Sequence, residues 1–383
     1  MIPYGRQHID QADIDAVVAV LRSDFLTQGP AVPAFETAVA QYAGAAHAVA
    51  VNSATSALHI ACMALDLGPG DLLWTVPNTF LASANCALYC GADVDFVDID
   101  PRTRNMCAKA LGTKLAHAAE RGRLPKVVVP VHFAGEPCDM AAIGAAARRH
   151  GVKVLEDASH AVGARFRDTR IGDAQHSDIV VFSFHPVKIV TTAEGGMALT
   201  QDAELARRMR LARSHGMERD PQRFQAPPEG DWVYEMQSLG YNYRLTDLQA
   251  ALGLAQMARV DAFVERRTAI ADRYDRLLAA LPLKLPARSA EQSSAWHLYA
   301  IELQRAAPAR AAVFARLRAA GIGVAVHYIP VHLQPMYRAR GFAPGDFPHA
   351  EAYYARCLSL PMYPDLDDAL QDQVVRAVEE ALA

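Results

Sequence analysis

The sequence lacks several features that would point to particular classes of protein. No apolar stretch is long enough to cross a bilayer, and residues 1–6 are too polar for a secretory signal peptide. The six cysteines include no Cys-x-x-Cys pair, which argues against both a zinc site and a disulfide framework. We therefore expect a reduced, cytoplasmic protein that uses no metal and does not contact a membrane.

The sequence also lacks an excess of charge of one sign. It has 38 basic and 42 acidic side chains, which gives a net charge of −4 over 383 residues. This balance argues against nucleic acid or an anionic membrane surface as the main partner. Apolar residues, in contrast, make up 51% of the chain, enough for a large core and two domains. We place a large domain at 1–250 and a smaller α+β domain at 251–383, with the N-terminal segment packed on the smaller one.

Short apolar, β-branched runs alternate with helical patterns along the first 200 residues. Strands are predicted at 48–51, 72–76, 94–98, 127–131, 152–155, 178–182 and 197–200, with helices at 57–67, 82–91 and 140–150. The alternation is typical of βαβ units, so we expect an α/β fold with a mainly parallel central sheet. Later segments predict a loop at 215–238, a helix at 248–278 capped by Thr246, and strands at 296–301 and 324–328.

One lysine, Lys188, follows the predicted strand 178–182 in a short connection that ends at Gly195 and Gly196. An amine at the end of a buried strand is partly desolvated, which lowers its pKa and allows it to form a Schiff base. Taken alone, such a lysine is more often an ordinary surface residue. Other residues also follow predicted strand ends, where open α/β sheets bind ligands: Thr55, Phe80, His132, Asp157 and Ser183.

These residues match the needs of one cofactor, pyridoxal 5′-phosphate. It requires a lysine, a carboxylate that keeps its pyridine nitrogen protonated, a phosphate cup and a flat side chain over the ring. The small residues and hydroxyls at 52–56 suit a phosphate at a helix N-terminus, and equally suit an ordinary helix cap. The candidates for the four roles are, in order, Lys188, Asp157, the turn Ala54–Thr55 with Ser183, and Phe80.

The sequence resembles the sugar-nucleotide aminotransferases of the DegT/DnrJ/EryC1/StrS type over nearly its whole length. The resemblance is carried by LTQGP at 26–30, NSATSALHIA at 52–61, EDASHAVGA at 156–164, SFHPVKIVTTAEGG at 183–196, GYNYRLTDLQAALG at 240–253 and VHYIPVH at 326–332. It implies a fold type I aminotransferase that works by ping-pong kinetics through an internal aldimine. One departure is Ala193, where the family more commonly has glycine.

The resemblance also implies roles for individual residues. Lys188 and Asp157 would be catalytic, and His160 would lie beside the cofactor phenolate. Asn242 would reach the cofactor phosphate of the neighbouring subunit, so that a homodimer shares its active sites. The predicted substrate-binding residues are Tyr4, His327, Tyr328 and Arg338.

A finer resemblance is to the pseudaminic acid branch of this family. It is carried by segments such as IPYGRQHID at 2–10, VHFAGEPCDM at 131–140 and LSLPMYP at 358–364. It implies amino transfer from L-glutamate to C4 of a UDP-linked 4-keto-6-deoxy-N-acetyl hexose, the reaction of a UDP-4-amino-4,6-dideoxy-N-acetyl-β-L-altrosamine transaminase. The alternatives are another C4 or C3 sugar aminotransferase, such as a perosamine-type enzyme, and a non-catalytic regulatory relative. A sugar dehydratase is disfavoured because those relatives replace the lysine with histidine.

Overall fold

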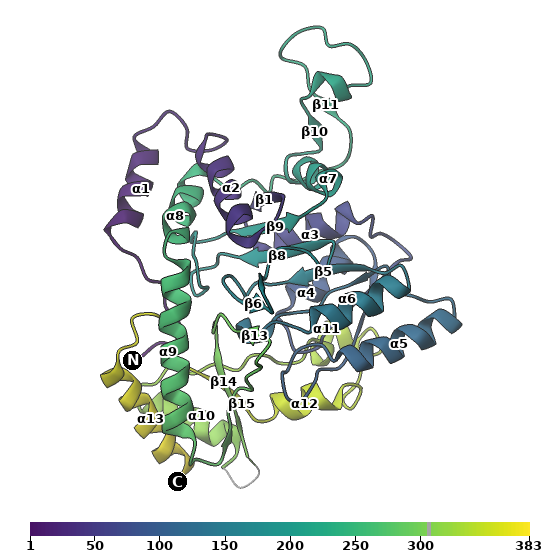
Figure 1. Ribbon diagram of the computed structural model, residues 1–383. Coiled ribbons are helices and arrows are strands. Elements are labelled where there is room, and N and C mark those ends of the chain that lie inside the picture. The colour runs from purple at the N-terminus through teal and green to yellow at the C-terminus, as the bar shows by residue number, and fades with distance from the viewer. Residues whose placement is uncertain (305–307) are drawn as a thin grey trace.

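A seven-stranded sheet forms the centre of the larger part of the molecule (Figure 1). The computed structural model describes residues 1–304 and 308–383. The strand order is β1-β9-β8-β5-β4-β2-β3. Strand β9 pairs antiparallel with β1 and β8, and the other pairs are parallel, which confirms the predicted α/β fold. The strands are β1 (His47–Val51), β2 (Leu72–Thr75), β3 (Asp93–Phe96), β4 (Val127–Val128), β5 (Lys153–Asp157), β8 (Ile179–Ser183) and β9 (Gly196–Thr200).

Helices cover both faces of this sheet. Helix α3 contacts α4 and α7, whereas α5 and α6 contact each other on the opposite face (Figure 1). Ser53 begins α3 by accepting a hydrogen bond from the Ser56 N–H, and this cap directs the first turn toward the carboxyl ends of the strands. The bounds are α2 (Ala31–Ala43), α3 (Ala54–Ala64), α4 (Ala82–Tyr89), α5 (Ala108–Glu120), α6 (Met140–Arg149) and α7 (Ala203–Arg213).

The predicted helix 248–278 is wrong in one respect, because it is two helices, α8 (Asp247–Met257) and α9 (Val260–Leu278). Thr246 caps α8 in a reciprocal pair of bonds with Gln249, as predicted. The break at Ala258 and Arg259 contains neither glycine nor proline, so the local sequence carries no signal for it. It is a tertiary effect, since the Arg259 guanidinium pairs with two aspartates at the start of α1 (Gln11–Leu21).

A smaller antiparallel sheet forms the second part, beside α9 (Figure 1). It consists of β12 (Leu283–Lys284), β14 (Tyr299–Leu303) and β15 (Cys357–Leu360), covered by α10 (Arg310–Ala319) and α13 (Asp368–Leu382). Its hydrophobic core includes Ile270, Tyr274 and Leu317, separate from the core around the large sheet. Ile2 pairs with Ile322 at the edge of this part. The division of the chain at residue 250 stays a prediction.

The predicted strand 324–328 is wrong. Only Ala325 pairs with the small sheet, through a single bridge to Ser359. The chain then crosses to the large sheet, where the Tyr328 N–H donates to Asn78 Oδ1 at 3.3 Å and the Val331 N–H donates to the Pro77 carbonyl at 2.9 Å. An apolar, β-branched pattern cannot distinguish a strand from a segment that packs between two domains.

The remaining elements are short. The expected loop 215–238 contains a hairpin, β10 (Met217–Glu218) with β11 (Glu235–Met236), which stands out from the molecule above α7 in Figure 1. Among the described residues, no helix is long and apolar enough to span a membrane. The other short elements are β6 (Arg165–Phe166), β7 (Thr169–Arg170), β13 (Gln292–Ser293), α11 (Pro335–Arg338), α12 (Pro348–Tyr354) and the 3₁₀ turns η1 (Phe133–Gly135), η2 (Pro221–Arg223) and η3 (Val331–Leu333).

Candidate active site

A cavity of about 380 Å³ lies beyond the carboxyl ends of the central strands, and we call it the lysine cavity. It lies where the large sheet meets the segment that crosses from the small one. Of the residues predicted for the site, ten line it and two, Asn242 and Arg338, do not. The ten are Tyr4, Ala54, Thr55, Phe80, Asp157, His160, Ser183, Lys188, His327 and Tyr328.

Lys188 lies in the connection between β8 and β9, where its N–H donates to the His185 carbonyl at 2.9 Å and closes a turn. Burial lowers the pKa of Lys188 to about 8, although the Asp157 carboxylate acts in the opposite direction. Its Nζ lies 3.4 Å from Nε2 of His297, a residue just before β14 and more than a hundred positions later in the chain. The lowered pKa increases the fraction of neutral amine near neutral pH, the form that a nucleophile requires.

Asp157 is the last residue of β5, and the residue is 5% exposed. The Ser83 hydroxyl donates to Asp157 Oδ2 at 2.6 Å, and the Ser159 N–H donates to Oδ1 at 3.1 Å. Ser83 in turn lies 2.7 Å from the Thr79 hydroxyl. Ser83 and Thr79 are not among the predicted site residues, since hydroxyls in and before an alanine-rich helix carry no catalytic signal. These bonds hold the carboxylate in one orientation inside the cavity.

The first turn of α3 provides a cup of backbone donors. The N–H groups of Ala54 and Thr55 have no acceptor within the helix, because the preceding turn does not exist. Strand β9 passes very close behind them, and a Cβ on Gly196 would lie 2.5 Å from the Ala54 nitrogen. Only glycine fits there. Ser183, at the end of β8, adds a hydroxyl to the same end of the cavity.

Ala193, where the family more commonly has glycine, has a left-handed backbone with φ of 64°. Its N–H donates to the Thr191 hydroxyl at 3.0 Å. A left-handed conformation explains why glycine suits the position, and alanine retains the same turn.

Three histidines surround the lysine and are held neutral. Burial, followed by the charge of Lys188, keeps the pKa of His160 and of His297 well below the usual range, and the same causes lower that of His327 to about 4. His160 Nδ1 accepts from the Ala134 N–H at 3.2 Å, which assigns its proton to Nε2. His160 Nε2 therefore donates to the Tyr328 hydroxyl, 3.1 Å away. No sequence motif pointed to His297, and its only signal was a polar residue inside an apolar run.

Three predicted residues lie at the margin of the cavity or outside it. Phe80 lines the wall with 58% of its surface exposed, so nothing in this chain covers its outer face. Asn242 is exposed beside Ser214, and Arg338 is exposed on α11. Neither reaches the lysine cavity of its own chain.

The residues present fit pyridoxal phosphate. The cavity combines an amine of lowered pKa, a fixed carboxylate, and a cup of unpaired N–H groups next to hydroxyls. A side chain at position 196 would collide with the Ala54 nitrogen, so Gly196 leaves the N–H groups of this cup unobstructed. In the described ranges 1–304 and 308–383, no group of three or more His, Cys, Asp or Glu side chains is placed so that it could hold a metal ion.

Comparisons with known proteins identify the family of this chain. The DegT/DnrJ/EryC1/StrS aminotransferase family profile matches residues 7–379. The spore coat polysaccharide biosynthesis protein SpsC of Bacillus subtilis is 42% identical, over 99% of this chain and 96% of its own. Helicobacter pylori PseC, an aminotransferase involved in the biosynthesis of pseudoaminic acid, is 30% identical with a TM-score of 0.91, covering 100% of this chain and 99% of PseC. A family aminotransferase from Brucella abortus is 32% identical with a TM-score of 0.87, over 97% and 95%.

The profile match spans almost the whole chain, and the relatives cover it from end to end with the same fold. The fold, the lysine cavity and these comparisons lead to one assignment. The chain belongs to the DegT/DnrJ/EryC1/StrS aminotransferase family and is a pyridoxal phosphate-dependent sugar aminotransferase.

Proposed function

We propose that this enzyme transfers the amino group of L-glutamate to C4 of a UDP-linked 4-keto-6-deoxy-N-acetyl hexose. The observation that carries the amino transfer is the meeting of Lys188, Asp157 and the α3 cup in one cavity. The choice of sugar is supported by the likeness to PseC, at 30% identity and a TM-score of 0.91. A second candidate is another nucleotide-sugar aminotransferase of polysaccharide biosynthesis, favoured by the 42% identity to SpsC.

The chain's own residues have distinct tasks in this reaction. Pyridoxal phosphate, when bound, supplies an aldehyde for the amine and a ring that draws electrons from the reacting carbon. Ala54, Thr55 and Ser183 would hold its phosphate, and Asp157 would pair with its ring nitrogen. The Asp157 carboxylate needs no reorganisation for this, since Ser83 and Ser159 already fix it.

Lys188 Nζ is the group that moves a proton. With a pKa of about 8, it is close enough to neutral pH both to accept a proton from a substrate carbon and to release it. The neutral imidazole of His297, 3.4 Å from Nζ, provides a place for the amine without a competing positive charge. The Tyr328 hydroxyl stays protonated, because burial and then Asp157 raise its pKa, so it can hydrogen-bond a substrate oxygen.

The substrate assignment predicts a definite product. With ¹⁵N-labelled glutamate, the UDP-linked 4-keto-6-deoxy-N-acetyl hexose should gain the label at C4, as read by mass spectrometry and NMR of the product. The corresponding dTDP- and GDP-linked keto-sugars serve as controls and should turn over at least about 10-fold more slowly, the scale of losing one or two specific contacts. Turnover restricted to dTDP- or GDP-linked sugars would replace the proposed sugar and leave amino transfer intact.

We also propose that the working unit is a homodimer with shared sites. Asn242 is exposed and lies outside the lysine cavity of its own chain, while its neighbour Tyr243 accepts a backbone bond from Asn52, just before the α3 cup. A second copy would bring its Asn242 to the phosphate, where the amide donates a charge-assisted hydrogen bond. Arg338 stays a prediction for sugar binding, since its exposed position on α11 requires the substrate or a partner to reach it.

This proposal predicts complementation between two inactive variants. Lys188→Ala and Asn242→Ala chains, co-expressed with different tags and purified as the mixed dimer, should contain one site with both residues intact. Bound cofactor and turnover should then recover to roughly half of wild type per dimer, because one of two sites is restored. Each variant purified alone is the control. No recovery in the mixed dimer, with Asn242→Ala alone clearly impaired, would place Asn242 in its own chain's site.

A further inference from the structure

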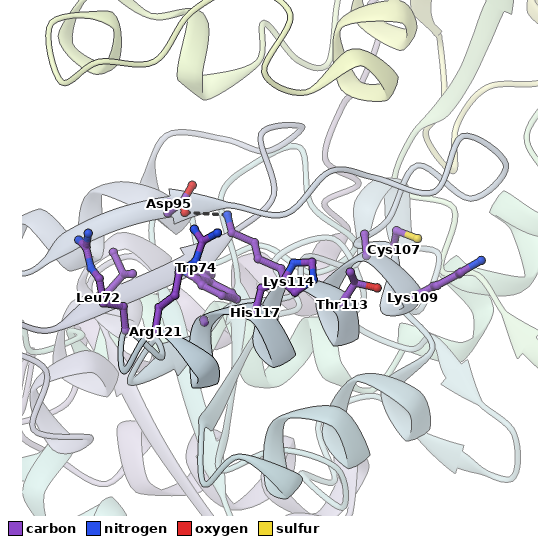
Figure 2. A pocket seen from close by; sticks show the side chains of 12 residues that line it. Leu72, Trp74, Asp95, Cys107, Lys109, Thr113, Lys114, His117 and Arg121 are labelled. Atoms are coloured by element: carbon purple, nitrogen blue, oxygen red, sulfur yellow. Dashed lines mark ion pairs between the residues drawn. The ribbon is translucent and has the colours of Figure 1, made fainter.

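A second and larger cavity, of about 750 Å³, lies between strands β2 and β3 and helix α5. It shares no lining residue with the lysine cavity. Figure 2 shows the side chains of α5 along one side and Trp74 and Asp95 of the strands facing them. Nothing in the proposed amino transfer uses it. We call it the basic groove.

The groove carries unpaired positive charge. Lys109, Arg121 and Arg123 line it and are exposed, and none makes a side-chain ion pair or hydrogen bond within the part of the chain that the structure describes. Asp95 is the only acidic residue among the described ones that line the groove, and Lys114 already pairs with it at 2.6 Å (Figure 2). Three cations without such a partner line one groove of a protein whose net charge is −4, with Lys109 at the opposite end of α5 from Arg121 (Figure 2), so the local field favours an anion.

One residue that lines the groove, Trp74, has a side-chain N–H group without a hydrogen-bond partner among the described residues. Trp74 on β2 is only 2% exposed, yet its Nε1 has no hydrogen-bond partner within the described residues. The ammonium of Lys114 lies 4.6 Å from the centre of its ring. A buried indole N–H usually finds an acceptor, because leaving it unpaired costs free energy. Trp74 is one of the residues that line the groove, so its indole signal can report on a ligand that binds there.

The apolar lining and the size of the groove indicate which class of anion it would bind. Leu72, Ala110 and Ala118 form an apolar surface beside the cations. A volume of about 750 Å³ is in the range of a small organic ligand and much larger than an inorganic phosphate. We propose that the basic groove binds a nucleoside diphosphate. Arg121 and Arg123 pair with the phosphates, and the apolar wall holds the base.

The test follows the Trp74 indole by NMR in the full-length holoenzyme labelled with ¹⁵N-tryptophan. The chain has three tryptophans, and Trp74→Phe identifies the signal by its loss. ADP is the probe, because a UDP ligand would also enter the lysine cavity under the proposed function. The Trp74 signal should shift saturably, with a Kd below about 1 mM. Added KCl should weaken binding, as expected for contacts with exposed cations.

Two double variants distinguish binding in the groove from nonspecific attraction to positive charge. Arg121→Ala with Arg123→Ala should raise the Kd at least about 10-fold, the scale of one hydrogen bond to a charged group. Arg22→Ala with Arg318→Ala removes two exposed arginines elsewhere and should leave the Kd unchanged. The proposal is overturned if millimolar ADP does not move the Trp74 signal, if pyrophosphate binds as tightly as ADP, or if only a hexaglutamate peptide binds. None of these outcomes bears on amino transfer.

Discussion

Replacing Lys188 with alanine is expected to abolish covalent attachment of the cofactor and to lower amino transfer to about 10⁻⁴ of wild type or less. This is the scale of losing an enzyme's nucleophile. Among the described residues, Lys188 is the only lysine that lines the lysine cavity, and burial lowers its pKa to about 8. No neighbouring amine can take its place, since His160, His297 and His327 are neutral imidazoles in the same cavity.

Borohydride reduction followed by peptide mapping measures the attachment directly. The label should appear on the peptide that contains Lys188 in the wild type and nowhere in Lys188→Ala. Lys153→Ala is a matched control, because Lys153 is an exposed lysine at the start of β5 that pairs with Asp178, and this variant should retain both label and activity. A borohydride label on any other lysine would contradict the assignment.

Asp157→Asn should lower kcat at least about 100-fold, on the scale of losing one electrostatic stabiliser of a transition state. Asparagine keeps the size of the side chain and can still accept from the Ser83 hydroxyl, 2.6 Å away in the wild type. It removes only the negative charge that would keep the cofactor ring nitrogen protonated. The loss should therefore fall on kcat more than on KM, and the absorbance of the bound cofactor should change with it.

Ser83→Ala provides the comparison, because it keeps the charge of Asp157 and removes one of its hydrogen bonds. Its effect should be about 10-fold or smaller, consistent with loss of one hydrogen bond to a charged group. Steady-state kinetics with glutamate measures both variants. Activity of Asp157→Asn within a few-fold of wild type would rule out the charge as a catalytic element, whatever the effect of Ser83→Ala.

The local sequence predicted the elements that end at the cavity. Alternating apolar runs and helical patterns were enough for β5 and β8, and the residues at their ends, Asp157 and Ser183, follow from that placement. The pattern failed at residues 324–328, which bridge two sheets. It also failed at the junction of α8 and α9, where Arg259 is held by α1. In both places contacts between distant segments override a local preference.

The sequence by itself determined the α/β fold class, the lysine and carboxylate at strand ends, and the family, because these depend on residue type and on spacing within one element. Only the tertiary structure decided which distant side chains meet them. Ser83 reaches Asp157 from α4, and His297 reaches Lys188 from the segment just before β14, at separations of 74 and 109 residues. The basic groove likewise exists only where α5 packs over β2 and β3. Such contacts depend on how elements cross in space, and no periodicity within a single element encodes that crossing.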